Sequence, residues 1–359
     1  MPVEGGPAGR AFRGNTLLRA ALRFAGYDVA CRPTAATATA TATTTSPAQG
    51  IESPPAAAGA VSAGGRYMHK LPAELESTRA LLEEYSGIPA DDVDRHVYEI
   101  RDRLWDVYPY ACVGHFRFAS LEFAADIYYQ QALARLLSAQ ETETASSSPG
   151  GDITRLLDVG CCVGQVLRKL AHDGVDSSRL YGTDVEPRFL DLGFDLFRDR
   201  ATFRGRFVVG DLLLPLPPEP TAMNHGGDGG PSNSSGSSNS ELDALDGSMT
   251  LVHATSFFHL FTWAEQVRAA TRIVRLLRAD GADVMVFGRQ VGTAAPRASG
   301  KAGSDKVYLH DGRSWQRLWD EVGARTGTRW RAAMAPTEKI QTGAAESSLR
   351  KMTFCVVRG

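Results

Sequence analysis

The strongest constraint on the fold is an alternation of segment types between residues 155 and 209. Short apolar runs typical of buried strands occupy 155–159, 180–184 and 206–209. Between them, at 165–173 and 187–198, apolar residues recur every three or four positions, which indicates helices. Strands and helices in this order form parallel strands joined by right-handed helical crossovers. The sequence therefore predicts an α/β protein with a doubly wound sheet.

The alternation resumes in the C-terminal half of the chain. The expected strands are 249–254, 282–288, 329–335 and 351–357, and the expected helices are 263–277 and 314–326. We therefore expect a Rossmann-like sheet of seven strands within residues 152–359. Two Gly-rich stretches, at about 217–248 and 292–305, predict flexible surface insertions.

The N-terminal third divides into two parts. Residues 1–65 are rich in Ala, Thr, Gly and Pro, which predicts a disordered low-complexity extension. Its Arg-containing stretch at 12–27 suits a mitochondrial transit peptide, and an unstructured extension or a misassigned start is the alternative. From 71 to 140 the spacing of apolar residues predicts helices, which we expect to form an N-terminal lid subdomain.

Composition excludes several classes of function. The net charge of −2 and the absence of a Lys/Arg stripe argue against a nucleic-acid partner. No apolar run reaches the roughly 20 residues that cross a bilayer, so no membrane partner is expected. The five cysteines lack paired C-x-x-C spacing, so no metal site is predicted, and a reducing, cytoplasmic compartment fits them.

The first strand runs into a loop of small residues, Asp158-Val159-Gly160-Cys161-Cys162-Val163-Gly164, which leads into a helix. Small residues at this place let the backbone approach a ligand in the crevice of an open α/β sheet. The spacing does not fit a dinucleotide fingerprint, and no Gly-Lys-Ser/Thr follows for a P-loop. An acid followed by small residues at alternate positions fits a methyltransferase that binds S-adenosylmethionine (SAM). Cys162 replaces the usual middle glycine, and a positive φ there would cost energy.

Two further acids end the next two strands. Asp184 lies 24 residues after Gly160, where it could accept the ribose hydroxyls, and Asp211 could accept the adenine amino hydrogens. Strand-end caps are the alternative interpretation of both. The predicted cofactor-binding residues are Asp158, Gly160, Cys162, Gly164, Asp184, Val185, Asp211, Leu212 and His253.

The turn after the fourth strand would face the transferred methyl group. Ser256 and Phe257 are candidates for the acceptor wall, and His259 is the candidate general base if the acceptor is a hydroxyl. A packed histidine at a strand-to-helix turn is an equal alternative for His259.

Six blocks of sequence resemble a known family. They are Tyr85-Ser86-Gly87-Ile88-Pro89, Tyr108-Pro109-Tyr110, Gly114-His115-Phe116-Arg117-Phe118, the loop at 157–162, the segment 192–199 and the segment 253–261. From residue 71 to the C-terminus, apart from the insertions, the chain resembles the fungal secondary-metabolite methyltransferases of the meroterpenoid pathways, of the austinol and terretonin type. The resemblance implies a class I fold, SAM as cofactor, and methyl-ester formation on a polyketide-derived intermediate.

A carboxylate acceptor is already ionised at neutral pH, so the enzyme mainly aligns the reactants. Tyr108, His115 and Arg117, with Arg289 as a further candidate, could hold a polyketide- or terpenoid-derived acceptor. The apolar candidates for its surroundings are Trp105, Tyr108, Tyr110 and Phe116.

Two other hypotheses stay open at this point. One is an N-methyltransferase for a small amine or a protein side chain, although the 255–258 turn has aromatics and no acid. The other is a catalytically silent SAM-binding protein. The sequence does not indicate the oligomeric state.

Overall fold

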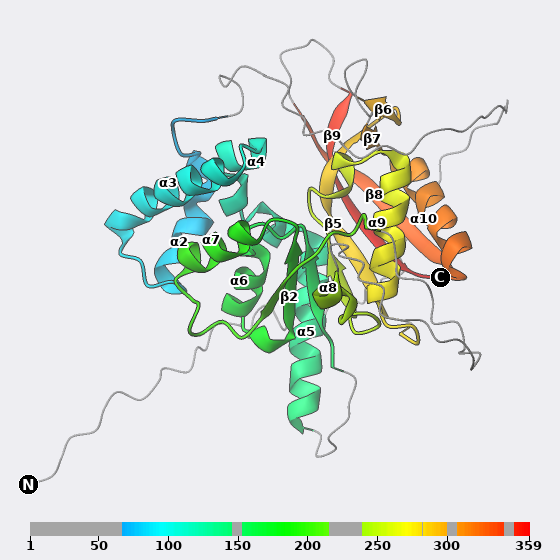
Figure 1. The fold of residues 1–359 in the computed structure, drawn as a ribbon, viewed down its shortest axis with the longest axis horizontal. Coiled ribbons are helices and arrows are strands. Elements are labelled where there is room, and N and C mark those ends of the chain that lie inside the picture. The colour runs from blue at the N-terminus through cyan, green and yellow to red at the C-terminus, as the bar shows by residue number, and fades with distance from the viewer. Residues whose placement is uncertain (1–66, 146–152, 215–238, 282, 300–306, 341–347) are drawn as a thin grey trace, which may run out of the picture.

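A seven-stranded sheet with the strand order β3-β2-β1-β4-β5-β9-β8 forms the centre of the molecule (Figure 1). The computed structural model describes residues 67–145, 153–214, 239–281, 283–299, 307–340 and 348–359. The strands of the sheet are β1 (Leu156–Val159), β2 (Leu180–Asp184), β3 (Arg206–Val209), β4 (Leu251–His253), β5 (Met285–Thr293), β8 (Trp330–Lys339) and β9 (Leu349–Arg358). The predicted doubly wound α/β sheet of seven strands is confirmed.

The first five strands are parallel, and β9 is antiparallel to both β5 and β8. Asp158 on β1 lies between Gly182 on β2 and His253 on β4 in the register of the sheet. The strand order reverses beside β1, where the chain goes first to β2 and later to β4. Ligand crevices of open α/β sheets form at such a switch point, outside the carboxyl ends of the strands.

Helices cover both faces of the sheet, so the central strands are apolar on both sides. One face carries α2 (Glu76–Glu84), α3 (Ala90–Val107), α5 (Ile127–Ala145), α6 (Gln165–His172) and α7 (Pro187–Phe197). The other face carries α8 (Ser240–Asp243), α9 (Trp263–Leu276) and α10 (Gly312–Thr326). In Figure 1, α2 and α3 lie beside α6 and α7, away from α9 and α10.

The N-terminal part is helical, as predicted, but it is not continuously helical between α3 and α5. Short 3₁₀ segments at Arg117–Ala119 and Glu122–Ala125 precede α5, and α4 (Ala111–Gly114) is a single turn. Phe116, between α4 and the first of these segments, has a left-handed backbone with φ of 56°. The chain therefore changes direction here instead of continuing as one helix.

Parts of both expected insertions form helix or strand in the described residues. Residues 239–248 include α8, whose Leu242 is buried in the core. Strand β5 extends to Thr293, and β6 (Arg297–Ser299) pairs with β7 (Val307–Leu309) as a separate two-stranded sheet. The predicted extension at 1–65 and the first part of the first insertion, up to residue 238, lie outside the described residues.

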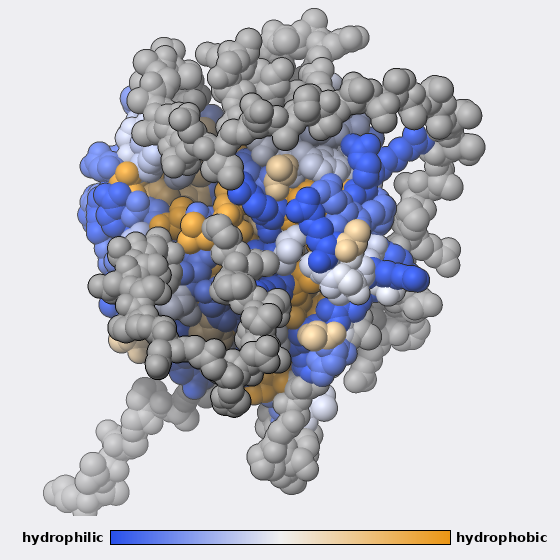
Figure 2. Space-filling model, turned by 45° about the vertical axis from the view of Figure 1, so that its right-hand side comes forward, coloured by the Kyte–Doolittle hydropathy of each residue, from blue (hydrophilic) through white to orange (hydrophobic). Residues whose placement is uncertain are grey.

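The surface shown in Figure 2 is mostly hydrophilic and has a hydrophobic area at its upper left. Among the helices of the described segments, none has the length and apolar character needed to span a bilayer. The larger exposed apolar side chains are instead concentrated at one edge of the sheet. Tyr108, Tyr110, Val185, Val209 and Leu260 lie in segments at or facing the carboxyl ends of the parallel strands.

Candidate active site

The loop between β1 and α6 has a left-handed backbone at every second residue. The φ angles of Gly160, Cys162 and Gly164 are 64°, 50° and 65°. Glycine adopts this conformation freely, whereas a residue with a Cβ loses roughly 1 kcal/mol or more. The predicted energetic cost at Cys162 is therefore present in the structure, at the position where the pattern would have glycine.

Close contacts explain why glycine flanks the loop. A Cβ on Gly160 would lie 3.1 Å from the ring of Phe257, and one on Gly164 would lie 2.5 Å from Arg168 Nη1. Phe257 thus reaches from the turn after β4 across the start of the loop. The loop is enclosed at both ends by side chains from other elements, which fixes its path.

Asp184, at the end of β2, is tied directly to this loop. Its Oδ2 accepts a hydrogen bond of 2.9 Å from the backbone N–H of Cys162, and its Oδ1 accepts one of 3.1 Å from Glu186 N–H. Burial raises the pKa of Asp184, while the backbone N–H groups that donate to it oppose the rise. The Val185 N–H also interacts with this carboxylate, which has about four acceptor positions, so at least one remains for a ligand. The sequence predicted Asp184 as a ribose acceptor but did not predict its bond to Cys162.

The end of β3 continues the same edge. Asp211 Oδ1 accepts from Leu213 N–H at 2.8 Å, and the Asn239 side chain bonds the Asp211 backbone N–H and C=O at 3.0 and 2.7 Å. Val185 and Val209 expose 57% and 42% of their surface, whereas Leu212 is buried in the core. The edge therefore combines carboxylates with exposed apolar side chains, a surface that suits a nucleoside. Asn239 has no recognisable signal in the sequence, because it ends a Ser/Asn-rich run.

Asp158 and His253 form a buried pair behind the loop. His253 Nδ1 lies 2.7 Å from Asp158 Oδ1, and His253 Nε2 lies 2.7 Å from Thr255 Oγ1, which accepts from Arg289 N–H at 3.1 Å. Because a carboxylate only accepts, His253 carries its hydrogen on Nδ1, and the Thr255 hydroxyl donates to Nε2. The chain of bonds joins β1, β4 and β5. Direct contact of these two side chains with the cofactor stays a prediction.

The N-terminal segment reaches the same edge through two tyrosines. The rings of Tyr108 and Tyr110 have centroids 4.2 Å apart, and Tyr110 contacts Phe189 on α7 with centroids 6.0 Å apart. Burial raises the pKa of Tyr110, and the neighbouring charges of Tyr108 and Asp184 add to the rise. Both tyrosines were predicted for the acceptor, and the structure places Tyr110 near the cofactor loop.

The turn after β4 forms the other side of the site. Ser256 has a left-handed backbone with φ of 57°, and His259 follows in a 3₁₀ turn at Phe258–Leu260. Burial, and to a smaller extent the positive charge of Arg117, lower the pKa of His259 to about 4. The buried His259 Nδ1 has no hydrogen-bond partner among the described residues. Arg117 extends from the 3₁₀ segment Arg117–Ala119, and its side chain has no ion pair within the described part of the chain.

Three other acceptor candidates have side-chain partners within the protein. Phe116 is buried against Tyr98 in the core of the N-terminal helices. Trp105 packs against Tyr67, and Arg289 lies 3.8 Å from Glu122 in an ion pair. Contact of these three residues with the acceptor stays a prediction. His115 is half-buried next to Arg117.

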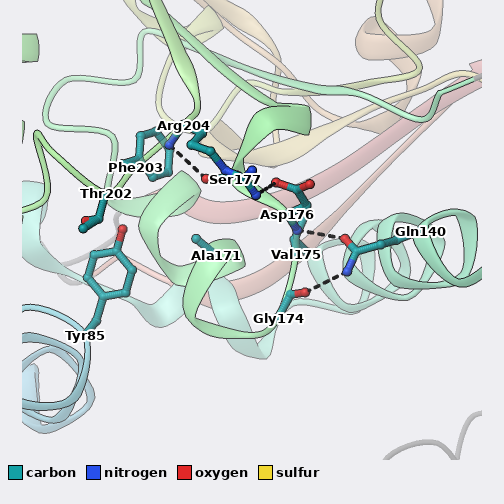
Figure 3. A pocket seen from close by; sticks show the side chains of 10 residues that line it. All are labelled: Tyr85, Gln140, Ala171, Gly174, Val175, Asp176, Ser177, Thr202, Phe203 and Arg204. Atoms are coloured by element: carbon teal, nitrogen blue, oxygen red, sulfur yellow. Dashed lines mark hydrogen bonds and ion pairs between the residues drawn. The ribbon is translucent and has the colours of Figure 1, made fainter. Parts of the chain in front are cut away.

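A separate hollow of about 480 Å³ lies at the opposite edge of the sheet (Figure 3). Val175, Ser177 and Arg204 line it, in loops that lead into the amino ends of β2 and β3. It is therefore not the predicted cofactor crevice. The segments that the structure describes contain no group of His, Cys, Asp and Glu side chains that could hold a metal ion.

Comparison with known proteins agrees with this geometry. Residues 66–119 match a family described as meroterpenoid methyltransferase N-terminal domain. O-methyltransferase phiE of Fungal sp. (strain ATCC 74256) is 37% identical over 264 residues, which cover 72% of this chain and 75% of phiE. O-methyltransferase atr3 of Stereocaulon alpinum is 37% identical over 75% of this chain and 68% of its own length. The chain belongs to the fungal secondary-metabolite methyltransferases.

Membership of this family gives the loop and the acids their context. A further relative, the Asnovolin E/Chermesin D methyltransferase nvfJ of Aspergillus novofumigatus, is 32% identical over 72% of this chain and 81% of its own length. This methyltransferase uses SAM and methylates a small-molecule acceptor. The left-handed loop, the free acceptor position of Asp184 and the exposed Val185 and Val209 fit that cofactor.

Proposed function

We propose that this methyltransferase transfers the methyl group to a carboxyl oxygen of a polyketide- or terpenoid-derived acceptor, with a hydroxyl oxygen as the second possibility. The observation that carries the proposal is the position of Arg117, which has no ion pair among the described residues, beside the half-buried His259. A cation without an ion pair beside apolar side chains suits an anionic acceptor. The two relatives named as O-methyltransferases support oxygen as the acceptor atom.

The electrostatics of His259 favour a carboxylate over a hydroxyl. A hydroxyl acceptor needs a base whose pKa is near the working pH. His259, with a pKa of about 4, is neutral at pH 7 and a weak base. A carboxylic acid with a pKa of about 4 is already ionised and needs no base. We therefore assign His259 a hydrogen-bonding role toward the acceptor rather than the role of general base.

The cofactor supplies an electrophilic methyl group, and the remaining work falls to the protein. Asp158, Gly160, Cys162, Gly164, Asp184, Val185, Asp211, Leu212 and His253 are proposed to hold or support SAM. Arg117 is proposed to hold the acceptor carboxylate, and Tyr108, His115, Ser256 and Phe257 to surround it. Phe257, which contacts both the cofactor loop and Phe261, would keep water out at the boundary between the two ligands.

Gln290 adds a further polar group at this edge. It lies three residues beyond Phe287, the partner of His253 in the register, and is therefore past the end of β4. Its side chain is buried, and neither its nitrogen nor its oxygen has a partner among the described residues. Buried polar groups without a protein partner usually meet water or a ligand. We propose that Gln290 binds a polar substituent of the acceptor.

The test is an assay of the full chain with matched acceptors. Aromatic and terpenoid carboxylic acids are compared with the corresponding alcohols and phenols, and products are identified by mass spectrometry and by cleavage in alkali, which opens esters but not ethers. We expect methyl esters, and a kcat/KM that is flat between pH 6 and 9. Methyl ethers with a rate that rises with pH would move the hydroxyl to first place. Transfer only to amines, or SAM binding without transfer to any acceptor, would overturn the proposal.

A further inference from the structure

Arg168, one turn into α6, is a charged residue at the centre of the protein. Its side chain has no exposed surface. A buried charge is costly unless it is paired and hydrogen-bonded. The interactions of Arg168 therefore indicate what the fold gains by keeping it.

The guanidinium links the cofactor loop to the end of α7. Its Nε and Nη2 donate to both carboxylate oxygens of Asp199 at 2.9 and 3.1 Å, and its Nη1 donates to the Val163 carbonyl at 3.2 Å. The same Nη1 lies 2.5 Å from the place that a Cβ on Gly164 would occupy. The guanidinium carbon also lies 4.6 to 5.2 Å from the ring centres of four aromatic residues, Phe194, Phe197, Phe203 and Phe207. The last two residues of the cofactor loop therefore rest on this group.

Tyr85, at the end of α2 in the N-terminal subdomain, completes the network. Its hydroxyl donates to Asp199 Oδ2 at 2.9 Å, the same oxygen that accepts from Arg168 Nε. Burial and the charge of Asp199 raise the pKa of Tyr85, so the hydroxyl keeps its proton and remains a donor. In Figure 3, Tyr85 reaches from its helix toward the loop that carries Thr202 and Phe203. The N-terminal subdomain is thus bonded to the base of the cofactor loop, at a distance in sequence of 114 residues from Asp199.

We propose that Arg168 and Tyr85 are positioning residues for the cofactor. Arg168 holds the Val163 carbonyl and the Gly164 backbone in the conformation that receives SAM, and Tyr85 fixes Arg168 through Asp199. Besides its proposed contact with the acceptor, the N-terminal subdomain would then help to fix the conformation of the cofactor loop, through the bond of Tyr85 to Asp199. This inference rests on the proposed cofactor loop at Gly160–Gly164 and does not depend on the nature of the acceptor.

The first test is Tyr85→Phe in the full chain, which removes one hydroxyl and keeps the ring that contacts Phe197. Tyr98→Phe is the matched control, because the Tyr98 hydroxyl accepts from Leu71 N–H within the N-terminal subdomain. We expect Tyr85→Phe to weaken binding of S-adenosylhomocysteine about three- to tenfold by calorimetry, less than the roughly 10- to 150-fold of one hydrogen bond to a charged group, because Tyr85 acts on the loop only through Asp199 and Arg168. In steady state, the KM for SAM should rise while kcat at saturating SAM and the KM for the acceptor stay unchanged. Tyr98→Phe should change none of these.

The measurements separate positioning from simple stabilisation. A structural role alone would lower the melting temperature of Tyr85→Phe but leave the affinity of the folded protein for S-adenosylhomocysteine unchanged, and that result would overturn the inference. An equal loss of affinity in Tyr98→Phe would also overturn it. Because affinity is measured without an acceptor, failure of the carboxyl assignment would leave this result standing.

Hydrogen exchange gives an independent readout on the same two proteins. Amides of the 158–168 segment should exchange faster in Tyr85→Phe than in the wild type and Tyr98→Phe, since the support under Val163 is loosened. Arg168→Lys keeps the charge but cannot bond Asp199 in bidentate fashion, so it should weaken binding more than Tyr85→Phe does. If Arg168→Lys does not fold, the tyrosine pair decides the question alone. Unchanged exchange of this segment in Tyr85→Phe would contradict the proposal.

Discussion

The two halves of the active-site edge differ in how their polar groups are satisfied. In the cofactor half, formed by the Gly160–Gly164 loop and Asp184, backbone N–H groups already occupy part of the carboxylate. In the proposed acceptor half, to which we assign Arg117, His259 and Gln290, the described residues supply no ion pair for Arg117 and no hydrogen-bond partner for Gln290 or His259 Nδ1. The geometry of the cofactor half is therefore fixed by hydrogen bonds within the protein. The polar groups of the acceptor half have no such bonds among the described residues.

This difference indicates how such an enzyme keeps one cofactor while accepting a particular substrate. A preorganised loop binds the same ligand with little rearrangement, because its geometry is fixed by bonds within the protein. Unpartnered polar groups instead favour a ligand that forms hydrogen bonds with them. A ligand without the matching groups leaves them unpaired, which makes its binding free energy less favourable. Substitutions in the two halves should therefore have separable effects.

The largest expected effect is that of Asp184→Ala on the cofactor. The change removes the predicted ribose acceptor and also leaves the N–H groups of Cys162 and Glu186 without their bonds. Charge-assisted hydrogen bonds of roughly 1.5–3 kcal/mol correspond to a loss of about 10- to 150-fold in SAM affinity by calorimetry. Asp191→Ala, an exposed carboxylate on α7, is the control and should leave affinity unchanged. If Asp184→Ala binds SAM normally, the ribose assignment is wrong.

The cofactor half was the more predictable of the two from sequence. Its signals are local: Asp184 directly ends a strand, and the loop residues between Gly160 and Gly164 follow each other, so parallel topology alone brings them together. The acceptor half depends on where the 3₁₀ segment at Arg117 docks against His259, which no periodicity indicates. Arg168 was missed for the same reason, because its partner Asp199 lies 31 residues away at the end of another helix.

The acceptor half should be sensitive to acid through His259. Its pKa is about 4 in the fold and about 6.5 when unfolded, so between these values the unfolded chain binds a proton that the native protein does not. Stability therefore falls as the pH drops from about 6.5 to about 4. The side chain is partly exposed, which weakens the effect. We therefore expect the acid-induced loss of unfolding free energy to be about 2 kcal/mol smaller in His259→Asn than in the wild type. Urea unfolding at pH 7.5 and 4.5 measures it, and equal acid losses in both proteins would place His259 in a more solvated position.

Arg117→Gln should affect the acceptor and not the cofactor. Loss of one charged contact predicts about a tenfold lower kcat/KM for a carboxylic acid, or about 1.4 kcal/mol, with SAM affinity unchanged. The control is Arg103→Gln, an exposed arginine on α3 that pairs with Asp195 and should change neither value. A parallel loss of SAM affinity in Arg117→Gln would show that the two halves are coupled and would weaken the comparison.

The smallest expected effect tests whether strain in the cofactor loop matters. Cys162 is left-handed, whereas its neighbour Cys161 is buried without a positive φ. Cys162→Gly relieves about 1 kcal/mol of backbone strain, which offsets the extra entropy that glycine gives the unfolded chain, so the free energy of unfolding should change by less than about 0.5 kcal/mol. Cys161→Gly gains no such relief and also loses a buried side chain, so it should cost about 2 kcal/mol. Denaturant unfolding measures both values. An equal loss of unfolding free energy in the two variants would mean that the packing of the Cys162 side chain stabilises the protein by more than its backbone strain costs.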